Sequence, residues 1–483
     1  LELNEMGLLT GMKDLGGGGL SCVVGELALD AGFGAKVDLE KVHLKVENMP
    51  PWEIWVSESQ ERMMFTVKPK NVNKVLEICK SWDVEAVSIG EVIAEKRNIV
   101  NYHGTEILNL DLEFTTGGPV YKRPYNLPEY NIGNPADLPP YPDDIEAQII
   151  NIINQPEVAS KDWVIRQYDH EVRGKTTLKP IQGPIGKEVP GDSSVIKPVN
   201  DSWKGLALTS DVNPYLMEAN PYHGTMSAVE EVCRNLASVG ARIDSLADCL
   251  CFGNPRKPDI MGQFKASCEA LRDAAVAVDV PYVSGNVSLY NETQEGAIPP
   301  TPVLMGIGLV NDIRKCVTSD MKSEGSIWLV GQTKEEMGAS LYYRTLGIEC
   351  PKVPTTNFKT FLPRMEQLIQ AIENEEVVAC HDISNGGLAL SIIEMCMSGF
   401  GAEITFDGKL RADVELFSES NGRWIVQVAT GCEDIFSKRF DFAKKIGNIN
   451  EKIIFKNSTE KLVELTIEEV RDKWTKPIWE RLA

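Results

Sequence analysis

DLGGGGL, at residues 14–20, and SESQER, at residues 57–62, form a pair of motifs that occurs twice in this chain. The second pair reads DISNGGL at 382–388 and SESNGR at 418–423. In both copies the glycine motif leads into an apolar run, and the serine motif follows in the same order. A motif pair that is repeated with its order intact indicates a duplicated domain.

The two copies flank a segment of different sequence, so the chain holds one type of domain, then a second type, then the first type again. A complete duplication would begin with a domain of the second type, and we expect that domain to be absent here. The chain opens at Leu1, already close to a motif, as we expect for a piece of a longer protein.

Length and composition indicate a globular protein. The 483 residues are enough for about three domains of ordinary size. Hydrophobic residues make up 43% of the chain and charged residues 25%, both typical of globular proteins. No run approaches the roughly 18 apolar residues of a membrane helix, and no signal peptide is visible.

Charge and cysteine usage narrow the expected partners and location. The formal net charge is −21, from 49 basic and 70 acidic residues. Such a surface repels nucleic acid and anionic membranes, so we expect neither as a partner. Eleven cysteines are scattered without regular spacing. This pattern favours reduced thiols and a cytoplasmic location.

Helical and strand-like periodicities alternate along the chain, which favours an α/β or α+β fold with helices covering sheets. The predicted helices span 17–31, 71–82, 145–154, 224–239, 259–278, 334–346 and 360–375. The predicted strands span 40–46, 62–68, 86–90, 95–101, 205–209, 281–284 and 303–310. Seven prolines between residues 117 and 145 exclude a regular element there. The predicted organisation is therefore a domain at 1–116, a linker at 117–145, and domains at 146–315 and 316–483.

Asp14 stands just before four glycines and the start of a predicted helix. Glycines let a backbone approach a phosphate closely, and a helix N-terminus offers free amide donors. A carboxylate at such a turn can hold Mg²⁺ against phosphate oxygens, so Asp14 is a candidate metal ligand. The alternative is a tight strand-to-helix turn capped by the aspartate. In the second copy Ser384 and Asn385 replace the first two glycines, so we interpret that copy as retained for packing.

Other polar clusters are candidate ligand sites. Ser57–Gln60 groups several hydrogen-bonding side chains that could bind a polar ligand. In the middle segment, polar clusters follow predicted strands at Thr209–Asp211, Asp248 and Gly285–Glu292, and Gly191–Ser194 adds a fourth. Such clusters at strand ends suit Mg²⁺ and triphosphate binding. Taken singly, Ser57–Gln60 is equally well explained as a hydrophilic loop, and each cluster of the middle segment is better explained as an ordinary polar turn.

Three further signals are weak. Cys249 and Cys251 resemble a metal-binding pair, but no second pair has zinc spacing, so core cysteines are the better interpretation. The dyad formed by His381 and Asp382 lacks a further histidine pair. Residues 183–187 fail the P-loop spacing.

The longest motifs resemble those of the small-type phosphoribosylformylglycinamidine synthases, in the PurM-like superfamily. The matching stretches are GMKDLGGGGLS at 11–21, PWEIWVSESQERM at 51–63, YDHEV at 168–172, DCLCFGNPRKPDIM at 248–261 and VSGNVSLYNET at 283–293. The resemblance covers essentially the whole chain. It implies a duplicated PurM-like architecture, present here as a C-type, an N-type and a C-type domain, and it matches the C-terminal two-thirds of the family's chain.

The resemblance also implies roles for individual residues. The implied sites are Asp14 and Asn286 for Mg²⁺, Glu58, Ser59, Gln60 and Ser288 for formylglycinamide ribonucleotide, and Asp248 and Gly285 for ATP. The family's catalytic histidine lies in an N-terminal domain that these residues lack, so we expect no catalytic residue here and no activity from this piece alone. Cys251 departs from the family, which often has asparagine at this position.

The implied activity is that of a ligase that forms a C–N bond in de novo purine biosynthesis. ATP activates the amide of formylglycinamide ribonucleotide by phosphorylation, and glutamine-derived ammonia displaces the phosphate to give the amidine. The implied partners are a glutaminase subunit and a small bridging subunit. Two alternatives remain open: a nucleotide-binding scaffold that docks a glutaminase without catalysis, and another PurM-like ATP-dependent enzyme.

Overall fold

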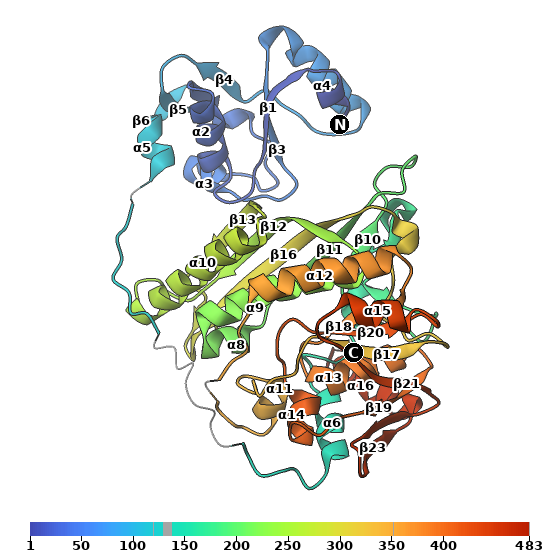
Figure 1. The fold of residues 1–483 in the computed structure, drawn as a ribbon. Helices are drawn as coiled ribbons and strands as arrows, with labels where there is room; N and C mark the ends of the chain where they lie inside the picture. Colours follow the sequence, from blue (N-terminus) through green and yellow to red (C-terminus); the bar gives the residue numbers. More distant parts are fainter. Residues whose placement is uncertain (119, 129–137, 351, 483) are drawn as a thin grey trace. The chain divides into compact units, whose positions relative to one another are not determined.

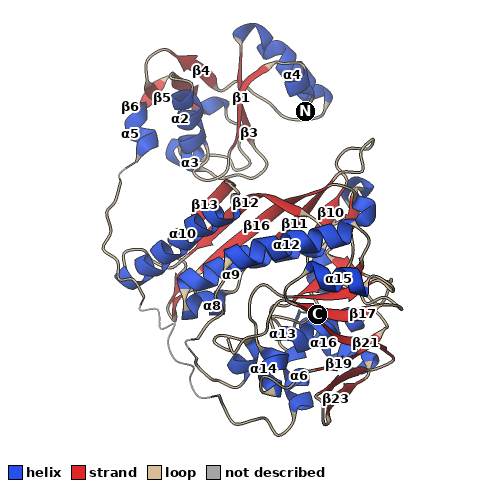
Figure 2. Cartoon of the chain, in the orientation of Figure 1, coloured by secondary structure: helices blue, strands red, loops and turns tan. Residues whose placement is uncertain are grey.

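The computed structural model describes residues 1–118, 120–128, 138–350 and 352–482. The chain divides into two compact units, Leu1–Lys122 and Arg123–Ala483 (Figure 1). Helices and strands alternate along both units (Figure 2), which confirms the predicted mixture of helices and sheets. Within the described residues, no helix combines the length and the apolar character needed to cross a membrane.

In the first unit, the glycine motif connects a strand to a helix. β1 (Leu9–Asp14) ends at the motif, and α2 (Leu20–Asp30) begins directly after it. β1 pairs antiparallel with β3 (Met63–Val67), which follows the serine motif. Because Asp14 is opposite Met63 in this register, the two motifs meet at one end of the ladder.

A four-stranded sheet in the order β4-β2-β5-β6 completes the core of this unit. Its strands are β2 (Gly34–Asp38), β4 (Gly90–Ile93), β5 (Arg97–Tyr102) and β6 (Thr105–Asp111). The other helices are α1 (Glu2–Glu5), α3 (Pro51–Val56), α4 (Val72–Ser81) and α5 (Leu112–Gly117). Buried aliphatic side chains of α2 pack with those of β2 and β5.

The second unit contains a six-stranded sheet in the order β13-β12-β16-β11-β10-β7. Its strands are β7 (Thr176–Leu178), β10 (Ser194–Ile196), β11 (Gly205–Asp211), β12 (Arg242–Cys251), β13 (Tyr282–Ser288) and β16 (Thr301–Val310). Helices α9 (Pro221–Ser238), α10 (Pro258–Val278) and α12 (Phe358–Glu373) cover one face of the sheet (Figure 1). Their buried side chains join those of the sheet in one apolar core.

A seven-stranded sheet in the order β18-β20-β17-β21-β19-β22-β23 holds the second motif pair. Its strands are β17 (Ser326–Val330), β18 (Val377–Asp382), β19 (Gly401–Thr405), β20 (Trp424–Val428), β21 (Ala443–Asn450), β22 (Ile453–Lys456) and β23 (Lys461–Leu465). The order β18, α13 (Gly387–Cys396), α14 (Ala412–Phe417), β20 repeats the order β1, α2, α3, β3. The duplication read from the motifs is therefore a duplication of structure.

The described part of the second unit also contains further helices and four two-residue strands. The remaining helices are α6 (Ile145–Ile153), α7 (Asp162–Ile165), α8 (Pro214–Ala219), α11 (Leu341–Thr345), α15 (Glu433–Arg439) and α16 (Ile467–Leu482). The remaining strands are β8 (Ile181–Gln182), β9 (Val189–Pro190), β14 (Glu292–Thr293) and β15 (Gly296–Ala297).

Several predicted elements need correction. The strand predicted at 40–46 is wrong, because β2 ends at Asp38 and a single 3₁₀ turn follows; the alternating apolar pattern there finds no strand to pair with. The strand predicted at 86–90 is displaced to β4, and the helix predicted at 334–346 shrinks to α11. Of the predicted linker, residues 119 and 129–137 lie outside the described part, and the described residues between α5 and α6 form no helix or strand.

Candidate functional site

The first motif pair folds into a turn that its own glutamate holds. The Gly18 N–H donates to Oε1 of Glu58 at 2.7 Å. Gly18 and Gly19 have φ angles of +75° and +55°, and a Cβ on Gly19 would collide with the carbonyl oxygen of Ser57. Only glycine fits both demands, because it tolerates a positive φ and lacks a side chain. The glycine motif and the serine motif therefore pack directly against each other.

Arg62 fastens the serine motif to this turn. Its Nη2 donates to the Ser57 carbonyl at 2.6 Å, and its Nε donates to the Ser59 carbonyl at 3.1 Å. The Arg62 carbonyl in turn accepts from the N–H of Leu15 at 3.0 Å. One guanidinium thus fixes the loop that carries three of the predicted substrate residues, a role that the sequence interpretation missed.

Asp14 lies at the end of β1 with an exposed carboxylate. Within the described residues, its side chain has no hydrogen bond or ion pair. Glu58, Ser59 and Gln60 are exposed as well. A free carboxylate beside a glycine turn and a polar loop offers hard oxygen ligands, which fit a hydrated Mg²⁺ ion. The structure thus brings Asp14 and the Glu58–Gln60 loop to the same end of the β1–β3 ladder.

The second motif pair makes the same contacts in a buried setting. The Gly386 N–H donates to Oε1 of Glu419 at 2.8 Å, as Gly18 does to Glu58. Arg423 donates to the carbonyls of Ser418 at 2.6 Å and Ser420 at 2.7 Å, as Arg62 does in the first copy. Burial raises the pKa of Glu419 to about 7, although two backbone N–H donors oppose the shift.

The aspartate of this second copy already has a cationic partner. Nε of Arg234, on α9, lies 3.0 Å from Oδ2 of Asp382, and both side chains are buried. The same guanidinium pairs with Glu230 and lies 3.2 Å from Glu231. Burial and the nearby Asp192 raise the pKa of Asp382 to about 7, and Arg234 opposes that rise. Asp382 therefore differs from Asp14 in burial and in charge compensation.

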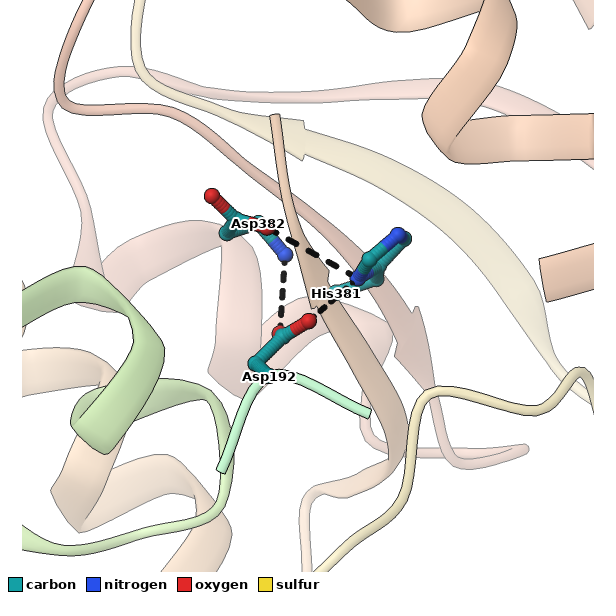
Figure 3. Close-up of side chains that lie close together, drawn as sticks. All are labelled: Asp192, His381 and Asp382. Atoms are coloured by element: carbon teal, nitrogen blue, oxygen red, sulfur yellow. Dashed lines mark hydrogen bonds and ion pairs between the residues drawn. The ribbon is translucent and has the colours of Figure 1, made fainter. Parts of the chain in front are cut away.

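His381 links two carboxylates beside this pair, and Figure 3 shows its contact with the first of them, Asp192. Its Nδ1 lies 2.6 Å from Asp192, and its Nε2 lies 3.1 Å from Glu394. Burial lowers the pKa of His381, but the two carboxylates outweigh it and raise the pKa well above the usual value. In the first copy Lys13 and Glu26 form the equivalent ion pair.

Asp192, His381 and Asp382 form the one group of three potential metal ligands in the part of the chain that the structure describes (Figure 3). Each already has a protein partner, since Asp192 also accepts from the Asp382 N–H at 3.0 Å. The compensation of buried charge by Arg234 and His381 accounts for this group as an ion-pair network. It needs no metal.

The predicted residues of β12 and β13 occupy both faces of the sheet. Asp248 is beside Gly285 in the parallel register, and a Cβ on Gly285 would lie 2.6 Å from Oδ1 of Asp248. Burial raises the pKa of Asp248. Asn286 and Ser288 follow Gly285 by one and three residues along the strand. Their side chains therefore project from the face of the sheet opposite to that of Asp248. Asn286 is exposed, and Ser288 donates to Asn291 at 3.3 Å.

The predicted polar site at Thr209–Asp211 borders a cavity. The cavity has a volume of about 260 Å³ and is lined mainly by Ser210, Asp211, Asn213, Glu231 and Asn385. Burial and the nearby Glu231 raise the pKa of Asp211 well above its usual value. Asp382 is not a lining residue.

Comparison with known proteins supplies the class. The model of the AIR synthase related protein C-terminal domain matches residues 1–103 and 326–455, and that of the N-terminal domain matches residues 190–310. The two matches to the C-terminal domain contain the two motif pairs. The chain therefore belongs to the AIR synthase related proteins, with its domains in the order C-type, N-type, C-type, as predicted.

Individual relatives narrow this class. Phosphoribosylformylglycinamidine synthase subunit PurL of Thermoplasma volcanium is 36% identical over 481 residues, which are 98% of this chain and 63% of that protein. The same subunit of Thermococcus sibiricus is 38% identical over 479 residues, which are 98% of this chain and 65% of that protein. The resemblance to this synthase family is confirmed, and the chain spans about two thirds of the length of these curated relatives.

A solved structure has a fold similar to that of this chain. The structure of Thermotoga maritima PurL complexed with ADP is 25% identical and superposes with a TM-score of 0.66, covering 93% of this chain and 65% of that chain.

Proposed function

We propose that this chain is part of a PurL-type phosphoribosylformylglycinamidine synthase. The synthase converts formylglycinamide ribonucleotide, ATP and glutamine-derived ammonia to formylglycinamidine ribonucleotide. ATP phosphorylates the amide oxygen, and ammonia then displaces the phosphate, so a C–N bond forms. The names of the relatives support the reaction class.

One observation carries the assignment of the site to the first copy. Asp14 and Asp382 occupy equivalent turns, but Asp382 is buried and paired with Arg234, whereas Asp14 is exposed and unpaired within the described residues. A carboxylate that is already neutralised gains little from a metal ion, because its charge is compensated. We therefore propose that Asp14 binds Mg²⁺ and that Glu58, Ser59 and Gln60 contact the ribonucleotide.

The middle domain supplies the remaining residues of the proposal. We propose that Asp248 and Gly285 contact ATP, that Asn286 binds Mg²⁺, and that Ser288 contacts substrate. The absence of a side chain at Gly285 leaves its backbone open beside the Asp248 carboxylate, which suits close approach of a ligand. Bound Mg²⁺ would neutralise charge on the transferring phosphoryl group.

The proposed partners are a glutaminase subunit and a small bridging subunit. The relatives are named as one subunit of their synthase, which supports an assembly with others.

The test is the effect of Asp14→Ala on the complete synthase subunit assayed with ammonium, ATP and formylglycinamide ribonucleotide. Loss of a metal ligand at the phosphoryl group should lower kcat about 10²–10³-fold, since electrostatic stabilisation of this kind is worth about 3–4 kcal/mol. Asp30→Ala, another exposed aspartate of the same unit, should leave kcat unchanged. Wild-type turnover by Asp14→Ala would remove Asp14 from the mechanism.

A further inference from the structure

Cys249 and Cys251 form a pair of thiols beside the predicted ligand residues of β13. They are two residues apart on β12, so their side chains project from the same face of the sheet. Their sulfur atoms lie 3.8 Å apart, and both residues are partly exposed. This is the one contact between cysteine sulfurs in the described residues. The two thiols are therefore in contact with each other and only partly buried.

The spacing of the two sulfurs fits a single metal ion bound by both thiolates better than it fits a disulfide. Residues i and i+2 of a strand are about 6.7 Å apart at Cα, which is at the upper limit for a disulfide. Two thiolates bound to one tetrahedral ion, with metal–sulfur bonds of about 2.3 Å, stand about 3.8 Å apart. The 3.8 Å between the sulfurs of Cys249 and Cys251, a distance at which either thiol can donate a hydrogen bond to the other, therefore also matches the separation of two thiolates on such an ion.

We propose that Cys249 and Cys251 chelate a soft divalent metal ion such as Zn²⁺. Binding would release the two thiol protons, because the thiolate is the ligand. The protein would supply two of four ligands, and water would occupy the other two, so the site would be open. Soft thiolate ligands exclude Mg²⁺, which prefers oxygen.

The position of the pair on β12 would place such an ion beside β13. In the parallel register Cys249 is beside Asn286, and Cys251 is beside Ser288. An ion held by the thiols would lie next to residues that we propose for Mg²⁺ and substrate. Soft metals should therefore inhibit the synthase by occupying this face; this consequence, unlike the metal binding itself, rests on the proposed function.

The test is a titration of the reduced chain with Cd²⁺ in the absence of nucleotide. The sulfur-to-cadmium charge-transfer absorbance and equilibrium dialysis should report one tight ion per chain. Cys249→Ser and Cys251→Asn should each weaken this binding at least 100-fold, since either change leaves a single thiolate. Cys350→Ser, at a partly exposed cysteine elsewhere, should leave it unchanged. Equal affinity in the wild type and both variants of the pair would overturn the proposal.

A second measurement serves if either variant fails to fold. In the wild-type chain, one equivalent of Cd²⁺ should protect Cys249 and Cys251 together from alkylation, as read by peptide mass spectrometry. Alkylation of both at the metal-free rate would also overturn the site. Because neither experiment contains ATP or substrate, their failure would leave the proposed ligase function standing, and loss of ligase function would leave the metal site standing.

Discussion

Arg234 and Asp382 form a buried ion pair, with Nε 3.0 Å from Oδ2. This pair is the main structural difference between the two copies of the duplicated motif pair. The two copies share the glutamate-to-glycine hydrogen bond and the arginine that clamps the serine motif. They differ at the aspartate, which is exposed in the first copy and neutralised in the second. We infer that the first copy kept a ligand-binding role and that the second copy became part of the core.

The ion pair predicts a large loss of stability on removal of Arg234. Arg234→Met would leave Glu230 and Asp382 buried without their cation. Breaking a buried pair from one side costs about 3–5 kcal/mol, because the remaining charge is uncompensated. We expect urea denaturation to report a loss of that size.

A surface pair supplies the control for this experiment. Lys476→Gln removes an exposed pair with Asp472 and should cost less than about 0.5 kcal/mol. Equal effects of the two substitutions would contradict a special role for Arg234.

The glycine turn predicts that alanine destabilises the protein at Gly19 but not at Gly17. Gly19→Ala would place a methyl group against the Ser57 carbonyl at a positive φ, so we expect the first unit to lose about 2 kcal/mol or more. At Gly17 a Cβ meets nothing within 4 Å, and Gly17→Ala should be nearly neutral. Hydrogen exchange of the amides in α2 and β3 measures both effects, and similar exchange in the two variants would refute the described packing.

Glu419 predicts a dependence of stability on pH. Burial raises its pKa to about 7 from an unfolded value of about 4.3. Because the folded state holds this proton more tightly, the contribution is fully present below about pH 4.3. It is lost as the pH rises towards 7. The folded protein should therefore lose stability across this window.

Glu419→Gln isolates that contribution, because glutamine can still accept from the N–H groups of Gly386 and Leu341 but does not titrate. Relative to wild type, the variant should gain stability between pH 5 and pH 8, up to about 3 kcal/mol at 1.4 kcal/mol per pKa unit. The free energy of unfolding in urea at the two pH values gives the difference. A difference that does not change with pH would show that Glu419 is ionised at pH 5.

Local features of the sequence predicted much of this fold. Glycine before an apolar helical pattern located the turns at Asp14 and Asp382, and the long apolar periodicities located α9, α10 and α12. The strand predicted at 40–46 failed because alternation alone does not supply a neighbouring strand. α3 was missed because its six residues are too short to show a helical period, although Pro51 marks its start.

The site was predicted less completely than the fold, because pairing across the chain leaves no local pattern. Arg234 meets Asp382 from 148 residues away, and nothing near Asp382 indicates that partner. The shared role of Arg62 and Arg423 could have been predicted from the sequence, since an arginine ends both copies of the serine motif. The exposure that distinguishes Asp14 from Asp382 became visible only in three dimensions.

The most direct test of the central claim compares Glu58→Gln with Glu419→Gln in isothermal titration of the chain with formylglycinamide ribonucleotide and Mg²⁺. The two glutamates make the same bond to equivalent glycines, so the pair is matched. We predict one binding site, with affinity lowered at least tenfold by Glu58→Gln and unchanged by Glu419→Gln. Binding that survives Glu58→Gln and is lost with Glu419→Gln would place the ligand at the second copy and contradict the account.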